Sequence, residues 1–299
     1  MEYKITGLQN IKKIPSLGIG VFDGLHIGHQ QIAKRCTHLL SFYPHPDIVL
    51  SKNKKLKMLT TLRELRFHKK NLLVVHFSKK IAKLPADLFL EKIIGALKPQ
   101  KIVVGYDFKF GFKKEGDFET LQKWALKNKI QVKKIEPIKA GPEIVKSSKI
   151  RTLIEHDNLN KAITYLGHPY LIIGTVIKGD GRGSSIGFPT ANILVPPKKL
   201  VPAHGVYKGK ILYGNQYLKA MIYIGKRSTF NKKDWTLEVH ILDYQKNIYG
   251  KQLKIFVEKK LRDDRKFNNA DELIRQIKQD IRNAKFSKKT IPPQLPYLQ

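Results

Sequence analysis

Apolar runs alternate with amphipathic stretches along the first half of the chain. Runs rich in Leu, Ile and Val predict strands at residues 17–22, 37–42, 72–77 and 101–105. Apolar positions at helical spacing predict helices at residues 61–70, 86–97 and 117–128. Continuously apolar strands that alternate with helices are typical of a parallel sheet covered on both faces. The first half is therefore predicted to be a doubly wound α/β module, whose ligands bind beyond the carboxyl ends of its strands.

The pattern changes after about residue 170, where glycine and proline become frequent. Short runs of alternating apolar and polar residues follow at 171–178, 205–212, 217–224, 236–242 and 252–259. This spacing predicts an all-β second half, built as an antiparallel barrel or a sandwich. A terminal amphipathic helix is expected at 270–284, and a helical bridge between the halves at 153–167. We place the domain boundary between residues 1–165 and 166–299.

The composition fits a globular protein with two domains. The chain has 299 residues, of which 41% are hydrophobic and 27% charged. No apolar run approaches the roughly 20 residues that cross a bilayer, and the N-terminus lacks the pattern of a signal peptide. Cys36 is the only cysteine, which excludes an internal disulfide. We therefore expect a cytoplasmic protein without a membrane partner.

The net charge of +33 has three possible explanations. It could reflect a lysine-rich solvated surface, steering of anionic substrates into a positive cleft, or binding to nucleic acid. The lysines are scattered along the chain, and aromatic residues are not interleaved with them in a stacking pattern. The sequence favours the first two explanations, and we expect no specific nucleic-acid binding.

A glycine-rich stretch follows the first predicted strand and ends in His26-Ile-Gly-His29. A helix is expected from Gln30 onward, so backbone N–H groups and close-lying glycines could face a phosphate. Two imidazoles at this spacing can reach the phosphate oxygens of ATP and stabilise charge as pyrophosphate leaves. The expected phosphate contacts of this stretch are Gly20, Phe22, Asp23, Gly24 and Gly28.

Two further segments belong with these histidines. Ser147, Ser148 and Arg151, at an expected helix start, offer hydroxyls and a cation to the β- and γ-phosphates. Between the two motifs, Gly105 to Gly111 follows a predicted strand. Its Asp107, Phe108 and Phe110 fit a nucleotide or flavin contact, although a turn with packed aromatics would give the same pattern.

A second glycine-rich stretch lies at residues 179–192. Gly181 and Gly183 belong to a loop that can wrap phosphates, and Pro189 leads into Thr190 and Asn192. The last two offer neutral oxygen ligands to a Mg²⁺ ion that bridges ATP phosphates.

Phosphoryl transfer also needs a base for the acceptor hydroxyl. We choose Glu238, which strand alternation places with His240 on the face opposite Leu237, Val239 and Ile241. An acid at such a position could also simply face solvent, and only the neighbouring glycine-rich motif favours a catalytic role.

Together these residues resemble the bifunctional riboflavin kinase/FAD synthetase family of bacteria, over nearly the whole chain. The resemblance implies a Rossmann-like nucleotidyltransferase module that transfers AMP from ATP to FMN, followed by an antiparallel β-barrel with a terminal helix that phosphorylates riboflavin. It implies Mg²⁺ as cofactor and riboflavin, FMN and ATP as partners. It assigns adenylyl transfer to His26, His29, Asp107, Ser147, Ser148 and Arg151, and the kinase reaction to Thr190, Asn192 and Glu238. The segment 261–267 looks like the family's flavin-covering segment, which makes Arg262 and Phe267 flavin-binding candidates.

The chain departs from the family pattern in places. The helix after His29 is expected to be short, and Lys146, Ser148 and Tyr223 replace residues that are usual in the family. Two alternatives therefore stay open: a kinase with an impaired adenylyltransferase module, or a basic RNA-binding derivative. A tRNA synthetase relative would also carry the histidine motif but leaves no place for the barrel motif. We expect a monomer or a weak homo-oligomer.

Overall fold

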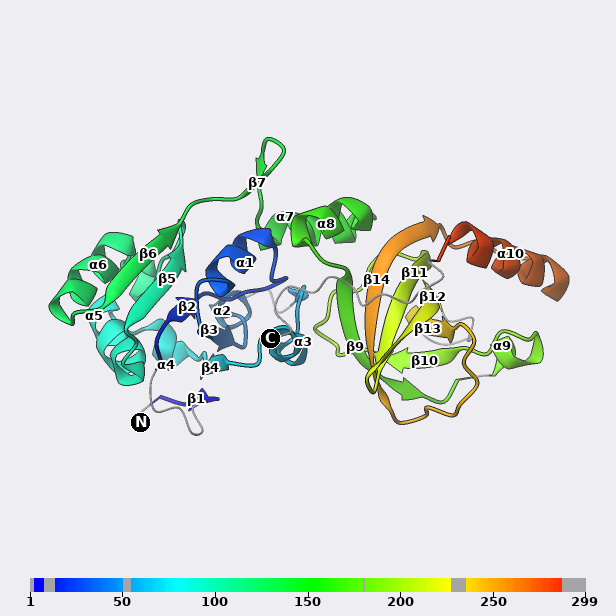
Figure 1. The fold of residues 1–299 in the computed structure, drawn as a ribbon, viewed down its shortest axis with the longest axis horizontal. Helices are drawn as coiled ribbons and strands as arrows, with labels where there is room; N and C mark the ends of the chain where they lie inside the picture. The colour runs from blue at the N-terminus through cyan, green and yellow to red at the C-terminus, as the bar shows by residue number, and fades with distance from the viewer. Residues whose placement is uncertain (1–2, 8–13, 51–54, 180, 227–234, 287–299) are drawn as a thin grey trace. The chain divides into compact units, whose positions relative to one another are not determined.

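The computed structural model describes residues 3–7, 14–50, 55–179, 181–226 and 235–286 (Figure 1). By compactness the chain divides between Ser147 and Ser148 into an N-terminal unit and a C-terminal unit. The helix α7 (Ser147–Glu155) begins at this division, and the expected domain boundary at 165/166 falls within the last turn of α8 (Leu159–Leu166), which packs on the last strand of the C-terminal unit. Each unit has its own cluster of buried hydrophobic residues.

The N-terminal unit is built on a six-stranded sheet with the order β1-β4-β3-β2-β5-β6. Neighbouring strands from β4 to β6 are parallel, and only the short edge strand β1 pairs antiparallel. The strands are β1 (Ile5–Thr6), β2 (Leu17–Ile19), β3 (His38–Tyr43), β4 (Leu72–His76), β5 (Lys101–Gly105) and β6 (Gln131–Ile135). The four predicted strands are confirmed. The pattern missed β6 because this edge strand is mostly exposed and rich in lysine.

Helices cover both faces of this sheet, which confirms the doubly wound prediction. They are α1 (Ile27–Ala33), α2 (Pro46–Leu50), α3 (Leu62–His68), α4 (Lys79–Ala82), α5 (Ala86–Phe89) and α6 (Phe118–Lys127). α5 continues as a π-helical turn, Leu90–Ile94, and a 3-10 turn, Gly95–Leu97. Alternate residues of one strand enter opposite cores: Leu39 packs with Ile32 of α1, whereas Leu40 packs with Ile94. A small hairpin of β7 (Lys139–Ala140) and β8 (Glu143–Ile144) precedes α7.

The C-terminal unit is a closed antiparallel barrel with the order β10-β13-β12-β11-β14-β9, so the barrel alternative holds and the sandwich is excluded. Its strands are β9 (Tyr170–Ile177), β10 (Ala191–Leu194), β11 (Gly205–Tyr213), β12 (Gln216–Lys226), β13 (Trp235–Ile241) and β14 (Gln252–Arg262). β10 closes the barrel by pairing with both β9 and β13. Besides α8, the described part of this unit contains the single turn α9 (Arg182–Ser185) and the terminal helix α10 (Ala270–Asn283).

Two predicted helix boundaries are wrong. The bridge expected at 153–167 is the pair α7 and α8, because Asp157 has a left-handed φ of 61° and Asn158 caps a new helix by accepting from the Lys161 N–H. The helix expected from Gln30 begins at Ile27, because the His26 side chain caps it. Among the described residues, no helix has the length and apolar character needed to cross a membrane.

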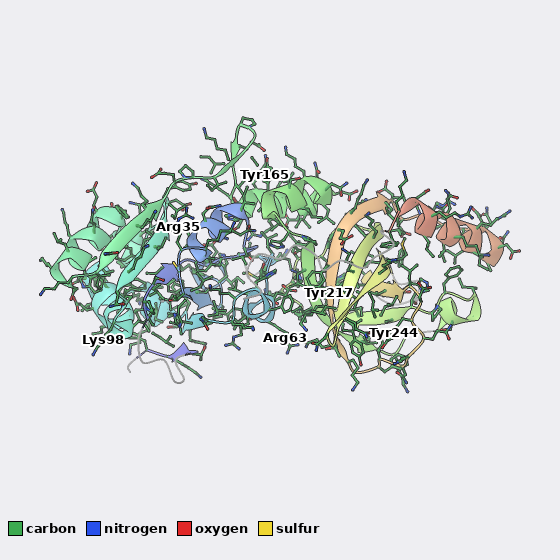
Figure 2. All side chains as sticks on the ribbon, viewed as in Figure 1. Arg35, Arg63, Lys98, Tyr165, Tyr217 and Tyr244 are labelled. Carbon is green, nitrogen blue, oxygen red and sulfur yellow. The ribbon has the colours of Figure 1, made fainter. Side chains whose placement is uncertain are left out.

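Basic side chains are spread over separate elements rather than gathered on one helix. In the N-terminal unit, Figure 2 labels the exposed Arg35 after α1, Arg63 on α3 and Lys98 after the 3-10 turn. These three basic residues lie on or next to separate elements of the N-terminal unit.

Helix α1 approaches the sheet closely at Gly18 of β2. A Cβ at Gly18 would lie 2.8 Å from a methyl group of Ile32 on α1 and 2.8 Å from a methyl group of Leu39 on β3. Both side chains are buried in the same core, so neither has open space to move into. The absence of a side chain at Gly18 therefore sets how close the histidine-bearing helix lies to the sheet.

We predict that Gly18→Ala destabilises the N-terminal unit by about 1–3 kcal/mol, because the added methyl overpacks the core. The matched control is Gly95→Ala, where the nearest atom to a new Cβ is the Leu90 carbonyl oxygen at an ordinary 3.4 Å. That change should be neutral or stabilise by about 0.4–1 kcal/mol. Denaturant unfolding followed by Trp124 fluorescence in a Trp235→Phe background measures both, and equal effects at the two glycines would contradict the prediction.

Candidate active sites

The turn that connects β2 to α1 has an unusual backbone. Phe22 and Leu25 adopt left-handed φ values of 57° and 41°, and Gly24 between them has a φ of 86°. Such conformations cost non-glycine residues about 1–3 kcal/mol each and occur mostly at functional sites. The Phe22 and Leu25 side chains are fully buried in the core, so tertiary packing supplies the energy that holds the turn.

Three hydrogen bonds from distant segments fix this turn. The Thr60 N–H donates to Asp23 Oδ1 at 2.9 Å, and the Thr60 hydroxyl accepts from the Gly24 N–H at 2.9 Å. The Ser147 hydroxyl donates to the Asp23 carbonyl oxygen at 2.7 Å. Ser147, which is expected to be a phosphate ligand, thus contacts the glycine-rich turn although it is 124 residues from Asp23 in the sequence.

His26 and His29 lie against each other at the start of α1. His26 Nδ1 accepts from the His29 N–H at 3.3 Å, and the two rings stack with centroids 3.6 Å apart. The edge of Phe22 packs on His29 at 5.4 Å. Burial, followed by the neighbouring His26, holds the pKa of His29 well below its ordinary value. Its Nδ1 is buried and has no hydrogen-bond partner among the described residues. Burial thus favours the neutral form of His29, whose ring is only half-buried and could meet a ligand at its accessible edge.

The aromatic segment after β5 has an exposed part and a buried part. Asp107 is exposed and Phe108 half-buried, whereas Phe110 lies in the core and contacts Phe89 at 5.4 Å. Phe108 stacks on Phe110 at 5.2 Å. The two interpretations of this segment thus apply to different residues: Phe110 is a packed aromatic, and Asp107 and Phe108 remain accessible to a ligand.

The first turn of α7 carries the remaining predicted phosphate ligands. Ser148 is exposed and Arg151 is half-buried. They are three residues apart on one helix, so their side chains share a face.

In the barrel, the pairing of β10 with β13 brings the predicted kinase residues together. Asn192 lies directly opposite Glu238 in the ladder. The Thr190 hydroxyl donates to Glu238 Oε2 at 3.1 Å, and the Thr236 hydroxyl donates to Asn192 Oδ1 at 3.3 Å. The alternation of β13 is confirmed, because Leu237 and Val239 are buried while Glu238 is half-buried.

The glycine-rich loop folds onto the same place. Gly181 has a left-handed φ of 71° and precedes the single turn α9, which the sequence did not predict. A Cβ at Gly183 would lie 2.4 Å from the Phe188 carbonyl oxygen and 3.1 Å from Thr190 Oγ1. His240 Nδ1 lies 2.8 Å from the Pro189 carbonyl oxygen, which fixes the end of the loop beside β13.

Arg262 and Phe267 lie in the segment between β14 and α10. Arg262 pairs with the buried Asp280 of α10 through Nε at 2.9 Å and Nη2 at 2.8 Å. The guanidinium carbons of Arg262 and Arg265 lie 5.7 and 4.7 Å from the Phe267 ring centre. Arg262 thus anchors the terminal helix and supports Phe267.

Sequence reasoning missed Thr60, Thr236 and the role of Tyr223. Tyr223 pairs with Glu238 across β12 and β13, and its hydroxyl donates to Asp264 at 3.2 Å. Burial, then Asp264 and Glu238, raise the pKa of Tyr223, so the phenol stays protonated. The departure from the family pattern at Tyr223 was a sequence signal for its role beside Glu238, whereas no such signal in the sequence marked Thr60 or Thr236.

The described residues contain no group of three or more His, Cys, Asp or Glu side chains that could hold a metal ion. The barrel site instead joins the Thr190 hydroxyl to the Glu238 carboxylate, with Asn192 opposite Glu238 in the ladder. Such oxygen donors suit a hard cation that takes its other ligands from water and substrate phosphates.

Known proteins match both units. The sequence model described as FAD synthetase matches residues 9–149, and the one described as riboflavin kinase matches residues 166–287. The bifunctional riboflavin kinase/FMN adenylyltransferase of Listeria monocytogenes is 34% identical over 293 residues, covering 92% of each chain. The Escherichia coli K12 protein of the same description is 34% identical, covering 94% of this chain and 96% of its own.

This chain belongs to the bifunctional riboflavin kinase/FMN adenylyltransferase family. It phosphorylates riboflavin to FMN and adenylylates FMN to FAD, using ATP in both reactions. A solved structure described as a macrolide-efflux protein from Streptococcus pneumoniae is also similar, with a TM-score of 0.81 and 28% identity over 93% of this chain and 96% of that one.

We predict that Gly179→Ala impairs the kinase without disturbing the barrel. A Cβ at Gly179 would lie 1.9 Å from Asn192 Nδ2, so the Asn192 side chain must move away. Displacement of a positioned group by about 1 Å can cost about 10²-fold in rate. Riboflavin phosphorylation should therefore fall by about that factor, while FMN adenylylation on the same chain stays unchanged.

The control is the pair Asn192→Ala and Gly179→Ala/Asn192→Ala. If Gly179 acts only through Asn192, the double variant should be no slower than Asn192→Ala. A further loss in the double variant, or wild-type phosphorylation by Gly179→Ala, would contradict this explanation.

Proposed function

We propose that each unit performs one of the two reactions with the residues that its fold gathers. The observation that carries the kinase assignment is the hydrogen bond between Thr190 and Glu238 beside Asn192. This hydrogen bond supports a site in which the Thr190 hydroxyl and the Glu238 carboxylate act together at the end of the glycine-rich loop. For adenylyl transfer, the support is the stacked pair of His26 and His29 on the constrained turn.

In the kinase site, Glu238 is the base that accepts the proton of the riboflavin hydroxyl as it attacks the γ-phosphorus of ATP. Thr190 and Asn192 would hold Mg²⁺, which would neutralise the negative charge of the phosphates. Gly181, Gly183 and Pro189 shape the loop around the phosphates. Phe267, supported by Arg262, is placed to cover the flavin.

In the adenylyltransferase site, catalysis is positional and electrostatic. The neutral His29 offers a nitrogen to the phosphates, and their negative charge favours a protonated imidazole once they are bound. Protonated imidazoles stabilise the charge that develops on the leaving pyrophosphate. Backbone of the turn contacts ATP, and Asp107 and Phe108 contact the flavin above the packed Phe110. The proposed ATP contacts are Gly20, Phe22, Asp23, Gly24, Gly28, Ser147, Ser148 and Arg151.

The rest of the proposal concerns the setting of the enzyme. We propose a Mg²⁺-dependent, cytoplasmic enzyme with domains at 1–165 and 166–299, acting as a monomer or weak homo-oligomer. The scattered basic side chains support substrate steering by a positive surface rather than specific nucleic-acid binding.

Glu238→Gln should abolish most riboflavin phosphorylation and spare FMN adenylylation, and His29→Ala should do the reverse. Loss of a positioned catalytic or charge-stabilising group typically costs about 10²–10³ in rate. Separation of riboflavin, FMN and FAD after incubation with ATP and Mg²⁺ measures both reactions on one sample. Equal loss of both activities in either variant would rule out two independent sites.

Thr190→Val should change the Mg²⁺ requirement of the kinase, because it replaces an oxygen ligand with a methyl group of similar size. We expect the Mg²⁺ concentration for half-maximal phosphorylation to rise, with the metal dependence of adenylylation unaltered. Thr190→Ser, which keeps the hydroxyl, is the control. An unchanged Mg²⁺ titration in Thr190→Val would remove Thr190 from the metal site.

A further inference from the structure

Thr60 holds the histidine-bearing turn from outside the adenylyltransferase motifs. Its backbone N–H and its side-chain hydroxyl form two reciprocal 2.9 Å hydrogen bonds, one with the Asp23 carboxylate and one with the Gly24 N–H. Thr60 is 36 residues from Gly24 in the sequence and belongs to the segment that leads into α3. Asp23 and Gly24 are both buried, so water competes little for these bonds.

The neighbouring Thr61 already serves the helix. Its hydroxyl accepts from the Glu64 N–H at 3.3 Å, while Glu64 Oε2 accepts from the Thr61 N–H at 2.7 Å. This capping box fixes the start of α3, and Glu64 is completely buried. Capping of α3 therefore does not need the Thr60 hydroxyl. The capped start of α3 directly follows Thr60 and holds the Thr60 backbone in place.

We propose that Thr60 is a positioning residue for adenylyl transfer, which sets the place of His26 and His29 by clamping the turn that precedes them. This role rests on the proposed assignment of the two histidines to that reaction. The two hydrogen bonds of Thr60 hold a part of the turn whose backbone conformation is unfavourable, because Leu25, directly after Gly24, has a left-handed φ of 41°. His26 follows Leu25 and caps α1, so a shift of the clamped residues moves both imidazoles.

The stacked geometry makes the site sensitive to such a shift. The His26 and His29 rings are 3.6 Å apart, and His29 also packs on Phe22 of the same turn. A 1 Å displacement of catalytic groups can cost about 10²-fold in rate. We therefore expect loss of the Thr60 hydroxyl to lower kcat for FMN adenylylation by about 10- to 100-fold, with a smaller change in KM.

The test compares three variants of the whole chain with the wild type. Thr60→Val is close in shape but lacks the acceptor for the Gly24 N–H, and Thr60→Ser keeps that acceptor. Thr61→Val is the matched control, because it removes the cap of the same helix without touching Asp23 or Gly24. Riboflavin phosphorylation, measured on each sample, reports the amount of folded C-terminal unit. Thr60→Val should lose adenylylation, Thr60→Ser should retain it, and Thr61→Val should lose stability but keep kcat.

A second measurement does not depend on adenylyl transfer. Titration of the His29 ring, followed by NMR, should show its pKa moving up toward the ordinary value in Thr60→Val, because a loosened turn exposes the ring to water. The pKa should stay low in Thr60→Ser and Thr61→Val. If wild-type protein makes no FAD, the proposed function fails, and this titration still decides whether Thr60 holds the turn.

Three outcomes overturn the proposal: wild-type kcat and His29 pKa in Thr60→Val, equal losses in Thr60→Val and Thr61→Val, or no rescue by Thr60→Ser. If Thr60→Val unfolds the N-terminal unit, Thr60→Ala removes the same acceptor and can be assayed at low temperature. Should both unfold while Thr60→Ser folds, the hydroxyl is a determinant of folding, and a positioning role is excluded.

Discussion

The residues that follow strand β2 leave the sheet, so their backbone N–H and C=O groups need hydrogen-bond partners other than neighbouring strands. The Gly20 N–H still bonds to Leu40 of β3, but Val21, Asp23 and Gly24 depend on the hydroxyls of Ser41, Ser147 and Thr60. Each of these side chains comes from a different segment, so the turn can form only when the surrounding fold has assembled. The adenylyltransferase site therefore depends on hydrogen bonds that cross the sequence, more than on the histidine motif itself.

The barrel meets a similar requirement through strand pairing. β10 is four residues long, yet it closes the barrel by pairing with β9 and β13. The same pairing sets Asn192 opposite Glu238, so closure of the barrel and assembly of the kinase site are one event. Polar side chains then join the loop to the ladder, as Thr190 does with Glu238 and Thr236 does with Asn192. A site built on paired strands is held rigidly, which suits a reaction that relies on positioning.

At each site, a glycine allows a neighbouring helix or side chain to lie close to the backbone. Gly18 lets α1 lie near the sheet, and Gly179 leaves room for the Asn192 side chain. In both cases a side chain would push a functional element away, while the fold around it could remain intact. Both glycines thus set the position of a neighbouring element through close packing.

The sequence by itself determined the doubly wound first half and the all-β second half, and it predicted several residues that the structure brings together at the turn before α1 and where β10 pairs with β13. It did so because periodicity, glycine-rich loops and short motifs are local signals. It misjudged the start of α1 and the break between α7 and α8, where side-chain caps at His26 and Asn158 decide the boundary. Only the tertiary structure showed that Phe110 is buried, that Arg262 pairs with Asp280 of α10, and that Thr60 and Thr236 form hydrogen bonds with Gly24 and Asn192. These contacts are made with residues that are distant in the sequence, so a local sequence pattern does not predict them.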